Sequence, residues 1–139
     1  MLEKMTVSAT LDSLKTITEF VVNSAKSANL EKKKIYKLRL AIDELATNII
    51  SYGYAESNAT GDIILECQIT ENSIEFKIID CGIAFDPRTK LESEEETIEI
   101  PLEERQIGGL GIFLAFDGVD EFAYERQGDR NINTLTIYR

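Results

Sequence analysis

The sequence predicts an α+β fold, a two-layer sandwich in which helices pack on one face of a mixed, mainly antiparallel sheet. Apolar residues recur every three or four positions between residues 11 and 52, which indicates helices, and they alternate with polar residues in 62–80 and 119–138, which indicates strands. Helices followed by antiparallel strands are typical of this class. With 139 residues, 43% of them apolar and 29% charged, the chain has the size and composition of one globular domain spanning residues 1–139.

The first half of the chain is predicted to contain two amphipathic helices after a short strand at Thr6–Thr10. Apolar side chains at helical spacing place the first helix in residues 11–28. A second helix is expected from about Leu30 to Tyr52, and its apolar residues extend beyond a single stripe, so we expect burial on more than one side. The sequence SYGYAESNATGD, residues 51–62, is expected to form a loop.

The second half is predicted to be rich in strands. Residues 62–70 and 73–80 alternate apolar and polar side chains across a short turn, which is typical of a β-hairpin. Residues 108–118 are expected to form a helix entered through glycines. Two further strands, at 119–126 and 131–138, are expected to close the sheet as a second hairpin.

A polar stretch, about residues 86–107, lies between the first predicted hairpin and the predicted helix 108–118 and is expected to be a surface loop. It contains both prolines of the chain, Pro87 and Pro101, and the acidic cluster between Glu92 and Glu96. A loop of ~20 residues inside a compact domain is more often functional than idle. The acidic cluster itself is interpreted as a solvated segment, because like charges repel and stay hydrated.

The charge and residue counts exclude several classes of function. The chain has 25 acidic and 15 basic residues, a net charge of −10, so neither nucleic acid nor an anionic membrane is an expected partner. The N-terminus lacks the apolar core of a signal peptide, and a cytoplasmic location is expected. Because the chain has no histidine, Ser-His-Asp and Cys-His catalysis and histidine-ligated metals are excluded. Cys67 and Cys81 are interpreted as small core residues.

The first candidate constellation is Glu44 with Asn48 on the second predicted helix. Residues four apart project from the same helical face. An asparagine carbonyl oxygen can bind Mg²⁺, and a neighbouring carboxylate can accept a proton from an attacking hydroxyl. Taken alone, the pair is more typical of a solvated helix face than of a functional site.

The second constellation is Asp80 followed by Gly82 at the end of an apolar strand, in the sequence DCGIAFDP. A carboxylate there can accept a hydrogen bond from an exocyclic amine such as that of adenine, and a glycine lets a flat ring approach the backbone. An ordinary turn from strand to loop has the same pattern.

The third constellation is the run of glycines at 108, 109 and 111, which opens an apolar helix in the sequence GGLGIFLA. Unhindered backbone N–H groups at the start of a helix can bind phosphate. No Lys-Ser/Thr follows, so the run is not a P-loop, and no strand precedes it, as a dinucleotide-binding fingerprint requires. The remaining alternative is a flexible connection.

Each constellation alone is weak evidence, but their order along the chain is specific. Together they resemble, in sequence, the N box, G1 box, ATP lid and G2 box of the GHKL ATPases: Glu44 with Asn48, Asp80 with Gly82, the polar stretch 86–107, and Gly109 with Gly111. Within that superfamily, the chain looks most like the anti-sigma-factor serine-protein kinases of the RsbW/SpoIIAB type. The resemblance covers nearly the whole chain and implies a Bergerat-type ATPase fold.

The resemblance implies roles for the N box and G1 box residues. Glu44 matches the proposed general base, and Asn48 matches the asparagine that ligates Mg²⁺. Asp80 matches the aspartate that recognises the amino group of adenine, and Gly82 matches the glycine beneath the base. Ala84, in the same box, is included among the expected nucleotide-binding residues.

The resemblance also assigns the G2 box and the end of the lid to the phosphates. The backbone amides of Gly109 and Gly111 match those that meet the phosphates, and Gly108 and Leu110 are included with them. Arg105, where the lid meets the G2 box, is a loosely matched candidate for a phosphate contact.

The function implied by the resemblance is that of an ATP- and Mg²⁺-dependent serine/threonine protein kinase and anti-sigma factor. Such a protein binds a sigma factor or similar target and phosphorylates a STAS-type antagonist, in a partner switch. A homodimer is expected by the same analogy. Two alternatives stay open: a regulatory binding module gated by nucleotide without transfer, and a sensor-kinase catalytic domain acting in trans on a histidine of another chain.

Overall fold

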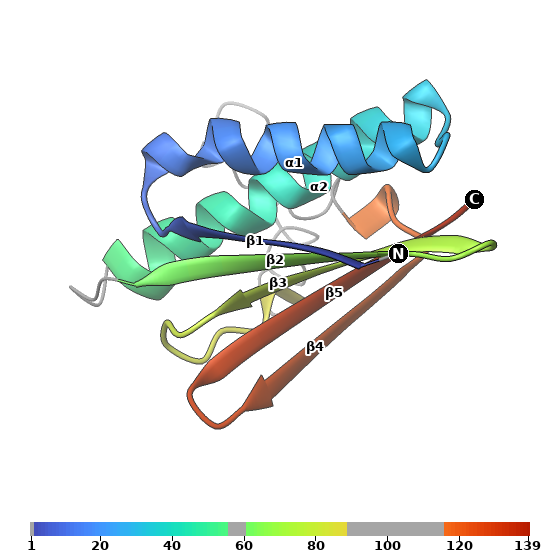
Figure 1. The fold of residues 1–139 in the computed structure, drawn as a ribbon. Helices are drawn as coiled ribbons and strands as arrows, with labels where there is room; N and C mark the ends of the chain where they lie inside the picture. The colour runs from blue at the N-terminus through green and yellow to red at the C-terminus, as the bar shows by residue number, and fades with distance from the viewer. Residues whose placement is uncertain (1, 56–60, 89–115) are drawn as a thin grey trace, which may run out of the picture.

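The fold is seen in a computed structural model, which describes residues 2–55, 61–88 and 116–139. Two helices lie over one face of a five-stranded sheet in two layers (Figure 1). The strand order is β1-β2-β3-β5-β4, and all four neighbouring pairs among the described strands are antiparallel. The predicted two-layer α+β fold is therefore confirmed. The elements are β1 Leu2–Ser8, a 3₁₀ turn Leu11–Ser13, α1 Leu14–Ser27, α2 Lys32–Asn48, a π-helical segment Ile49–Ala55, β2 Asp62–Ile69, β3 Ser73–Asp80, β4 Glu121–Gln127 and β5 Arg130–Tyr138.

The core lies between the helices and the covered face of the sheet. α1 contributes Ile17, Val21 and Ala25, each at most 1% exposed and four residues apart. These side chains stand on one helical face because of that spacing. In the sheet, the alternate residues of β2 and β3 are buried, and Phe76 meets the ring of Phe20 edge to face at a centroid distance of 6.4 Å. This packing fixes both helices over the central strands.

The first half of the chain departs from prediction in two places. β1 begins at Leu2, four residues before the predicted start, since its whole length pairs with β2. Residues 51–55, predicted as a loop, continue α2 as a π-helical segment. The buried Tyr54 anchors that segment: its hydroxyl donates to the Asp62 carbonyl oxygen at 3.0 Å and accepts from the Cys81 N–H at 2.7 Å. A turn-like sequence thus becomes helical through tertiary contacts.

The strands of the second half follow the predictions closely. The hairpin of β2 and β3 is confirmed, with boundaries within one residue of those expected. β4 and β5 form the second predicted hairpin, and Gly128 in its turn has a φ of +60°, which glycine adopts without strain. Of the predicted helix 108–118, residues 108–115 lie outside the described part of the chain.

The two cysteines differ in environment. Cys67 is fully buried, as expected, and burial raises its pKa to about 11. Cys81 is exposed, so the prediction that it is a core residue was wrong. The reason is that β3 ends at Asp80 and Cys81 already belongs to the following loop.

No helix in the described part of the chain is long and apolar enough to cross a membrane.

Candidate functional site

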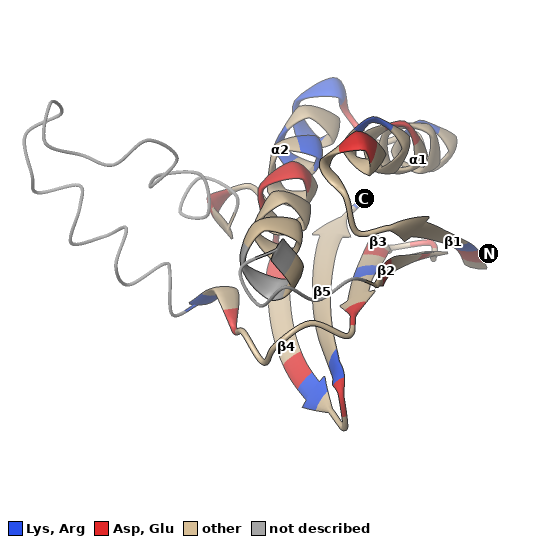
Figure 2. Ribbon diagram, turned by 90° about the vertical axis from the view of Figure 1, so that its left-hand side faces the viewer, with Lys and Arg blue, Asp and Glu red and all other residues tan. Residues whose placement is uncertain are grey.

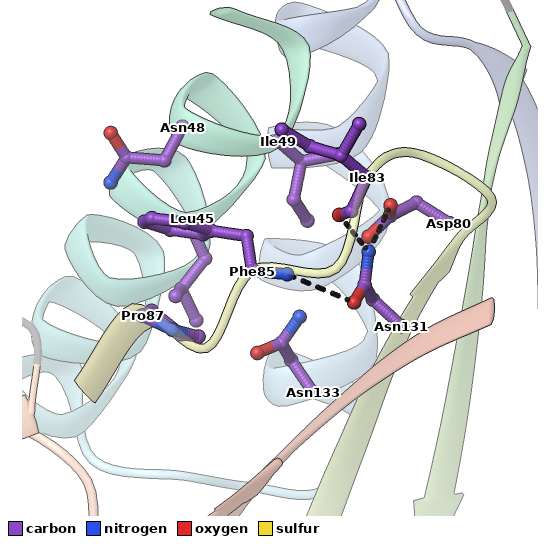
Figure 3. A pocket seen from close by; sticks show the side chains of 9 residues that line it. All are labelled: Leu45, Asn48, Ile49, Asp80, Ile83, Phe85, Pro87, Asn131 and Asn133. Carbon is purple, nitrogen blue, oxygen red and sulfur yellow. Dashed lines mark hydrogen bonds between the residues drawn. The ribbon is translucent and has the colours of Figure 1, made fainter. Parts of the chain in front are cut away.

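A small cavity, partly open to solvent, lies between α2 and the sheet (Figure 3). Its wall is made by the C-terminal part of α2, the end of β3, the loop that follows β3, and the start of β5. The fold thereby brings Asn48 and Asp80, from two of the predicted constellations, to one cavity. The lining residues are Leu45, Asn48, Ile49, Asp80, Ile83, Phe85, Pro87, Asn131 and Asn133.

Asp80 is 2% exposed and uses only half of its carboxylate for contacts within the described residues. Its Oδ1 accepts from the Gly82 N–H and from Asn131 Nδ2, both at 2.9 Å. Its buried Oδ2 has no hydrogen-bond partner there. Burial raises the pKa of Asp80 above its ordinary value, although these two bonds and the charge of Arg126 act in the opposite direction. The second oxygen is therefore an acceptor to which none of the described residues donates.

The side chain of Asn131, on β5, forms hydrogen bonds with the loop after β3. Besides its bond to Asp80, its Nδ2 donates to the Ile83 carbonyl oxygen at 2.8 Å. Its Oδ1 accepts from the Phe85 N–H at 3.3 Å and from the Tyr124 hydroxyl. These bonds join one side chain to the end of β3 and to two residues of the loop that follows, Ile83 and Phe85 (Figure 3). The loop is therefore held in a fixed conformation beside Asp80.

The guanidinium of Arg126 supports the same loop from β4. Its Nη1 donates to the Gly82 carbonyl oxygen at 2.9 Å, while its Nε donates to the Gly128 carbonyl oxygen in the hairpin turn. Gly82 is itself buried. The arginine therefore holds the loop against the second hairpin.

Asn133 lies two residues after Asn131 on β5 and also faces the cavity. It is 2% exposed, and its buried Oδ1 has no hydrogen-bond partner among the described residues. Buried polar atoms normally have partners. Two such acceptors, Asp80 Oδ2 and Asn133 Oδ1, in one cavity indicate a ligand that donates hydrogen bonds. Asp80, Asn131 and Asn133 together form what we call the strand end of the site.

The sequence analysis missed Asn131 and Asn133. Both occupy inward positions of β5, which Leu135 and Ile137 continue as apolar core residues. Two asparagines in a register that should be apolar are a signal in the sequence, because buried amides are rare unless they are bonded.

The rest of the cavity wall is apolar. Leu45 and Ile49 come from the helical layer, and Ile83, Phe85 and Pro87 come from the loop after β3. Ile83 lines the cavity although its side chain is 50% exposed. Apolar surfaces with a few polar groups at one end are typical of a site for a flat ring.

The helix end of the site consists of Asn48 and Glu44, one turn apart near the C-terminus of α2. Asn48 is 5% exposed and lines the cavity, so the solvated-face interpretation is wrong for this residue. Glu44 is half-buried and is not among the lining residues. Within the described residues, no group of three or more Cys, Asp or Glu side chains could hold a metal. Asn48 lines the cavity from α2, and an amide carbonyl oxygen is a type of ligand that Mg²⁺ accepts beside waters and phosphates.

The remaining predicted residues are partly described. Ala84 is exposed and does not line the cavity. Of the predicted lid, residues 86–88 are described: Asp86 forms a salt bridge with Arg88 at 2.7 Å. Burial alone would raise the pKa of Asp86, but the bonds from Arg88 outweigh it and lower the pKa. Arg105, Gly108, Gly109, Leu110 and Gly111 lie outside the described residues.

Comparison with known proteins shows sequence similarity along the chain. Residues 7–138 match the sequence profile of the histidine kinase-like ATPase domain. The serine-protein kinase RsbW of Listeria innocua is 32% identical over 91 residues, covering 65% of this chain and 57% of that protein. RsbW of Oceanobacillus iheyensis is 32% identical over 96 residues, covering 68% of this chain and 60% of that protein. The chain thus spans less than two thirds of the length of these curated relatives.

Two solved structures share the fold. The RsbU and RsbW domains of a Mycobacterium tuberculosis protein align with a TM-score of 0.67 at 18% identity, covering all of this chain and 33% of that one. The histidine kinase domain of a blue-light activated kinase from Erythrobacter litoralis aligns with a TM-score of 0.54 at 13% identity, covering 91% of this chain and 59% of that one.

Proposed function

The chain belongs to the histidine kinase-like ATPase family, and on this premise we propose that its cavity binds Mg²⁺-ATP for transfer of the γ-phosphoryl group to a protein hydroxyl. The observation that carries the proposal is a pair of buried acceptors in one largely apolar cavity, Asp80 Oδ2 and Asn133 Oδ1, which have no hydrogen-bond partner in the described part of the chain. An exocyclic amine is a donor group that such acceptors suit.

The strand end of the site fits an adenine base. Asp80 Oδ2 is the acceptor for the amino group, while Oδ1 is held by Gly82 and Asn131 and so fixes the direction of the carboxylate. Leu45, Ile49 and the loop after β3 enclose the ring faces. Excluding water from these faces strengthens the polar contacts at the strand end.

The helix end serves the phosphates. Asn48 offers its carbonyl oxygen to Mg²⁺, and Glu44, one turn earlier, is the general base that takes the proton of the attacking hydroxyl. When bound, Mg²⁺-ATP supplies the phosphoryl group and neutralises part of its developing charge. Gly109 and Gly111 donate backbone N–H groups to the phosphates, flanked by Gly108 and Leu110. Arg105 supplies a cation there, and Ala84 contacts the nucleotide at the cavity mouth.

The partner is a STAS-type antagonist, which the chain phosphorylates on serine or threonine, and the second partner is a sigma factor or similar regulatory target. The similarity to RsbW serine-protein kinases, at about one third identity, supports this assignment. The chain acts in the cytoplasm as a homodimer, with residues 1–139 forming one ATPase domain that has its ATP lid at about residues 86–107.

The test is incubation of the purified protein with labelled ATP, Mg²⁺ and the STAS-domain protein encoded nearest to it in the genome. We expect acid-stable phosphate on a serine or threonine of the STAS protein. Acid-labile phosphate on an added sensor-kinase histidine domain, in place of the STAS protein, would favour the trans-acting histidine kinase. Nucleotide binding without transfer to either substrate would support a nucleotide-gated binding module.

A further inference from the structure

The solvent-facing side of α2 carries basic and apolar residues that the proposed ATP site does not use. Lys33, Lys37 and Leu40 succeed one another at spacings of three and four residues, and Glu44 follows at the same spacing. Residues at this spacing lie on one helical face. Tyr36 stands beside them on the same exposed side. We call the surface formed by Lys33, Tyr36, Lys37 and Leu40 the α2 face.

The basic part of the α2 face stands out on an acidic protein. Of the 15 Lys and Arg residues in the chain, five lie between residues 32 and 39, although the net charge is −10. Figure 2 shows this basic cluster at one end of α2, with acidic residues further along the same helix. Among the described residues no salt bridge neutralises Lys33 or Lys37. In contrast, the Lys34 ammonium donates to the Tyr138 carbonyl oxygen at 2.9 Å and so has a structural contact.

The lysines at the start of α2 are unfavourable for the stability of that helix. Lys32, Lys33 and Lys34 occupy the first turn of α2, which contains no acidic residue, and Glu31 at the N-cap makes no capping bond with its side chain. Cations at a helix N-terminus interact unfavourably with the helix dipole. Residues that lower the stability of their own helix and have no compensating contact are typical of a functional surface.

The apolar part of the α2 face is exposed as well. Tyr36 is 60% exposed and Leu40 is 39% exposed, and both belong to the small set of exposed large hydrophobic residues in the described part of the chain. Exposed apolar side chains that lie together and are rimmed by polar residues are typical of a protein interaction site.

We propose that the α2 face is the docking surface for the phosphoacceptor protein, and that the partner meets it with an acidic segment that carries an apolar residue. This inference rests on the proposed kinase function. The α2 face leads directly to the proposed base: Leu40 lies one turn before Glu44, and Lys37 lies about 10 Å before it along the helix axis. A partner held by Lys33, Lys37 and Leu40 therefore presents its next segment at Glu44.

The experiment compares two double variants that change net charge equally. The test variant is K33E/K37E, and the control is K4E/K15E, in which Lys15 occupies the second position of α1 as Lys33 does in α2. Phosphorylation of the STAS-domain protein is measured as kcat and KM, together with the Kd for Mg²⁺-ATP and the Tm.

For K33E/K37E we expect KM for the STAS protein to rise roughly tenfold with kcat little changed, because lost charge complementarity weakens association. We expect an unchanged Kd for ATP and a Tm no lower than that of the wild type, because acidic side chains favour a helix N-terminus. A purely structural role would instead lower Tm. The control is expected to retain its KM. Should K33E/K37E fail to fold, K33Q/K37Q is expected to show a smaller rise in the same parameter.

If the wild type transfers phosphate and K33E/K37E has the same KM as the wild type, the docking inference alone is overturned. A wild type that neither binds nor phosphorylates the STAS protein overturns the proposed function and the docking inference with it. A second variant, L40S, tests the apolar contact, and an unchanged KM there restricts the docking surface to its lysines, contrary to the proposal.

Discussion

At the strand end of the site, Asp80 and Asn131 lie in a dense network of buried hydrogen bonds, whereas at the helix end Glu44 and Asn48 stand one turn apart on a single helix. The strand end draws its geometry from β3, β5 and the loop between Asp80 and Phe85. At the helix end, the four-residue spacing along α2 places Glu44 and Asn48 on one face of the helix. We propose that the two ends have different roles: the strand end selects the nucleotide base, and the helix end takes part in phosphoryl transfer.

The largest effect is expected from E44Q at the helix end. Glutamine keeps the size of the side chain but cannot accept the proton of an attacking hydroxyl, so phosphoryl transfer should fall by roughly 10²–10⁴-fold while the Kd for ATP stays within about threefold. Single-turnover transfer and nucleotide titration measure the two quantities. D43N, at the neighbouring position of α2, is the matched control and should transfer normally. Equal losses of transfer and ATP binding in E44Q would contradict the division of roles.

At the strand end, D80N should weaken ATP binding by roughly 100-fold, because an N–H₂ group can replace the free acceptor and oppose the amino group of the base. Binding is measured by calorimetric titration in Mg²⁺. A variant that binds ATP as tightly as the wild type would remove Asp80 from the base-binding site.

The same variant reports on the pKa of Asp80. Burial raises that pKa above 3.8, so the folded chain binds more protons than the unfolded chain in the window above pH 3.8, and stability falls as pH rises through it. Asparagine carries no charge at any pH. The Tm of D80N should therefore exceed that of the wild type at pH 7, and the difference should shrink on acidification towards pH 3.8. A difference that grows on acidification would show that the pKa is lowered instead.

A smaller effect is expected from N133L, which removes the second acceptor and leaves the network of Asn131 untouched. We expect a loss of about tenfold in ATP affinity with unchanged or higher stability, since the buried Oδ1 has no partner among the described residues. T134V, on the opposite face of β5, is the matched control. Urea unfolding and nucleotide titration test the prediction, and a strongly destabilised N133L would mean that the amide has a structural role.

The smallest effect is expected from Y54F, which changes a contact behind the site. The hydroxyl bonds to Asp62 and Cys81 are lost, so the free energy of unfolding should fall by about 1–2 kcal/mol. Y36F, which keeps an exposed ring on α2, should be neutral. Urea denaturation distinguishes them, and equal stability of both variants would show that Tyr54 does not hold the π-helical segment.

The sequence alone predicted the elements that periodicity defines. The alternation in 62–80 located the hairpin of β2 and β3, and the four-residue spacing of Glu44 and Asn48 placed them on one helical face. Asp80 could be singled out because a carboxylate ends an apolar strand. Each of these features depends on neighbours in the chain.

Features that depend on distant contacts escaped prediction. The π-helical segment is stabilised by Tyr54 reaching β2 and the loop after β3, and its sequence is typical of a turn. Asn131 could not be assigned because its partners come from the end of β3, from the loop after β3 and from β4. Only a known strand register reveals that Asn131 pairs with Asp80.

The central claim is that Asp80 Oδ2 and Asn133 Oδ1 accept hydrogen bonds from the amino group of adenine. Its most direct test is a comparison of ATP with ITP, which carries an oxygen in place of that amino group, by calorimetric titration of the wild type in Mg²⁺. We predict that ATP binds at least about 100-fold more tightly, because a 6-oxo group would face two buried acceptors. Equal affinity for the two nucleotides would contradict the account.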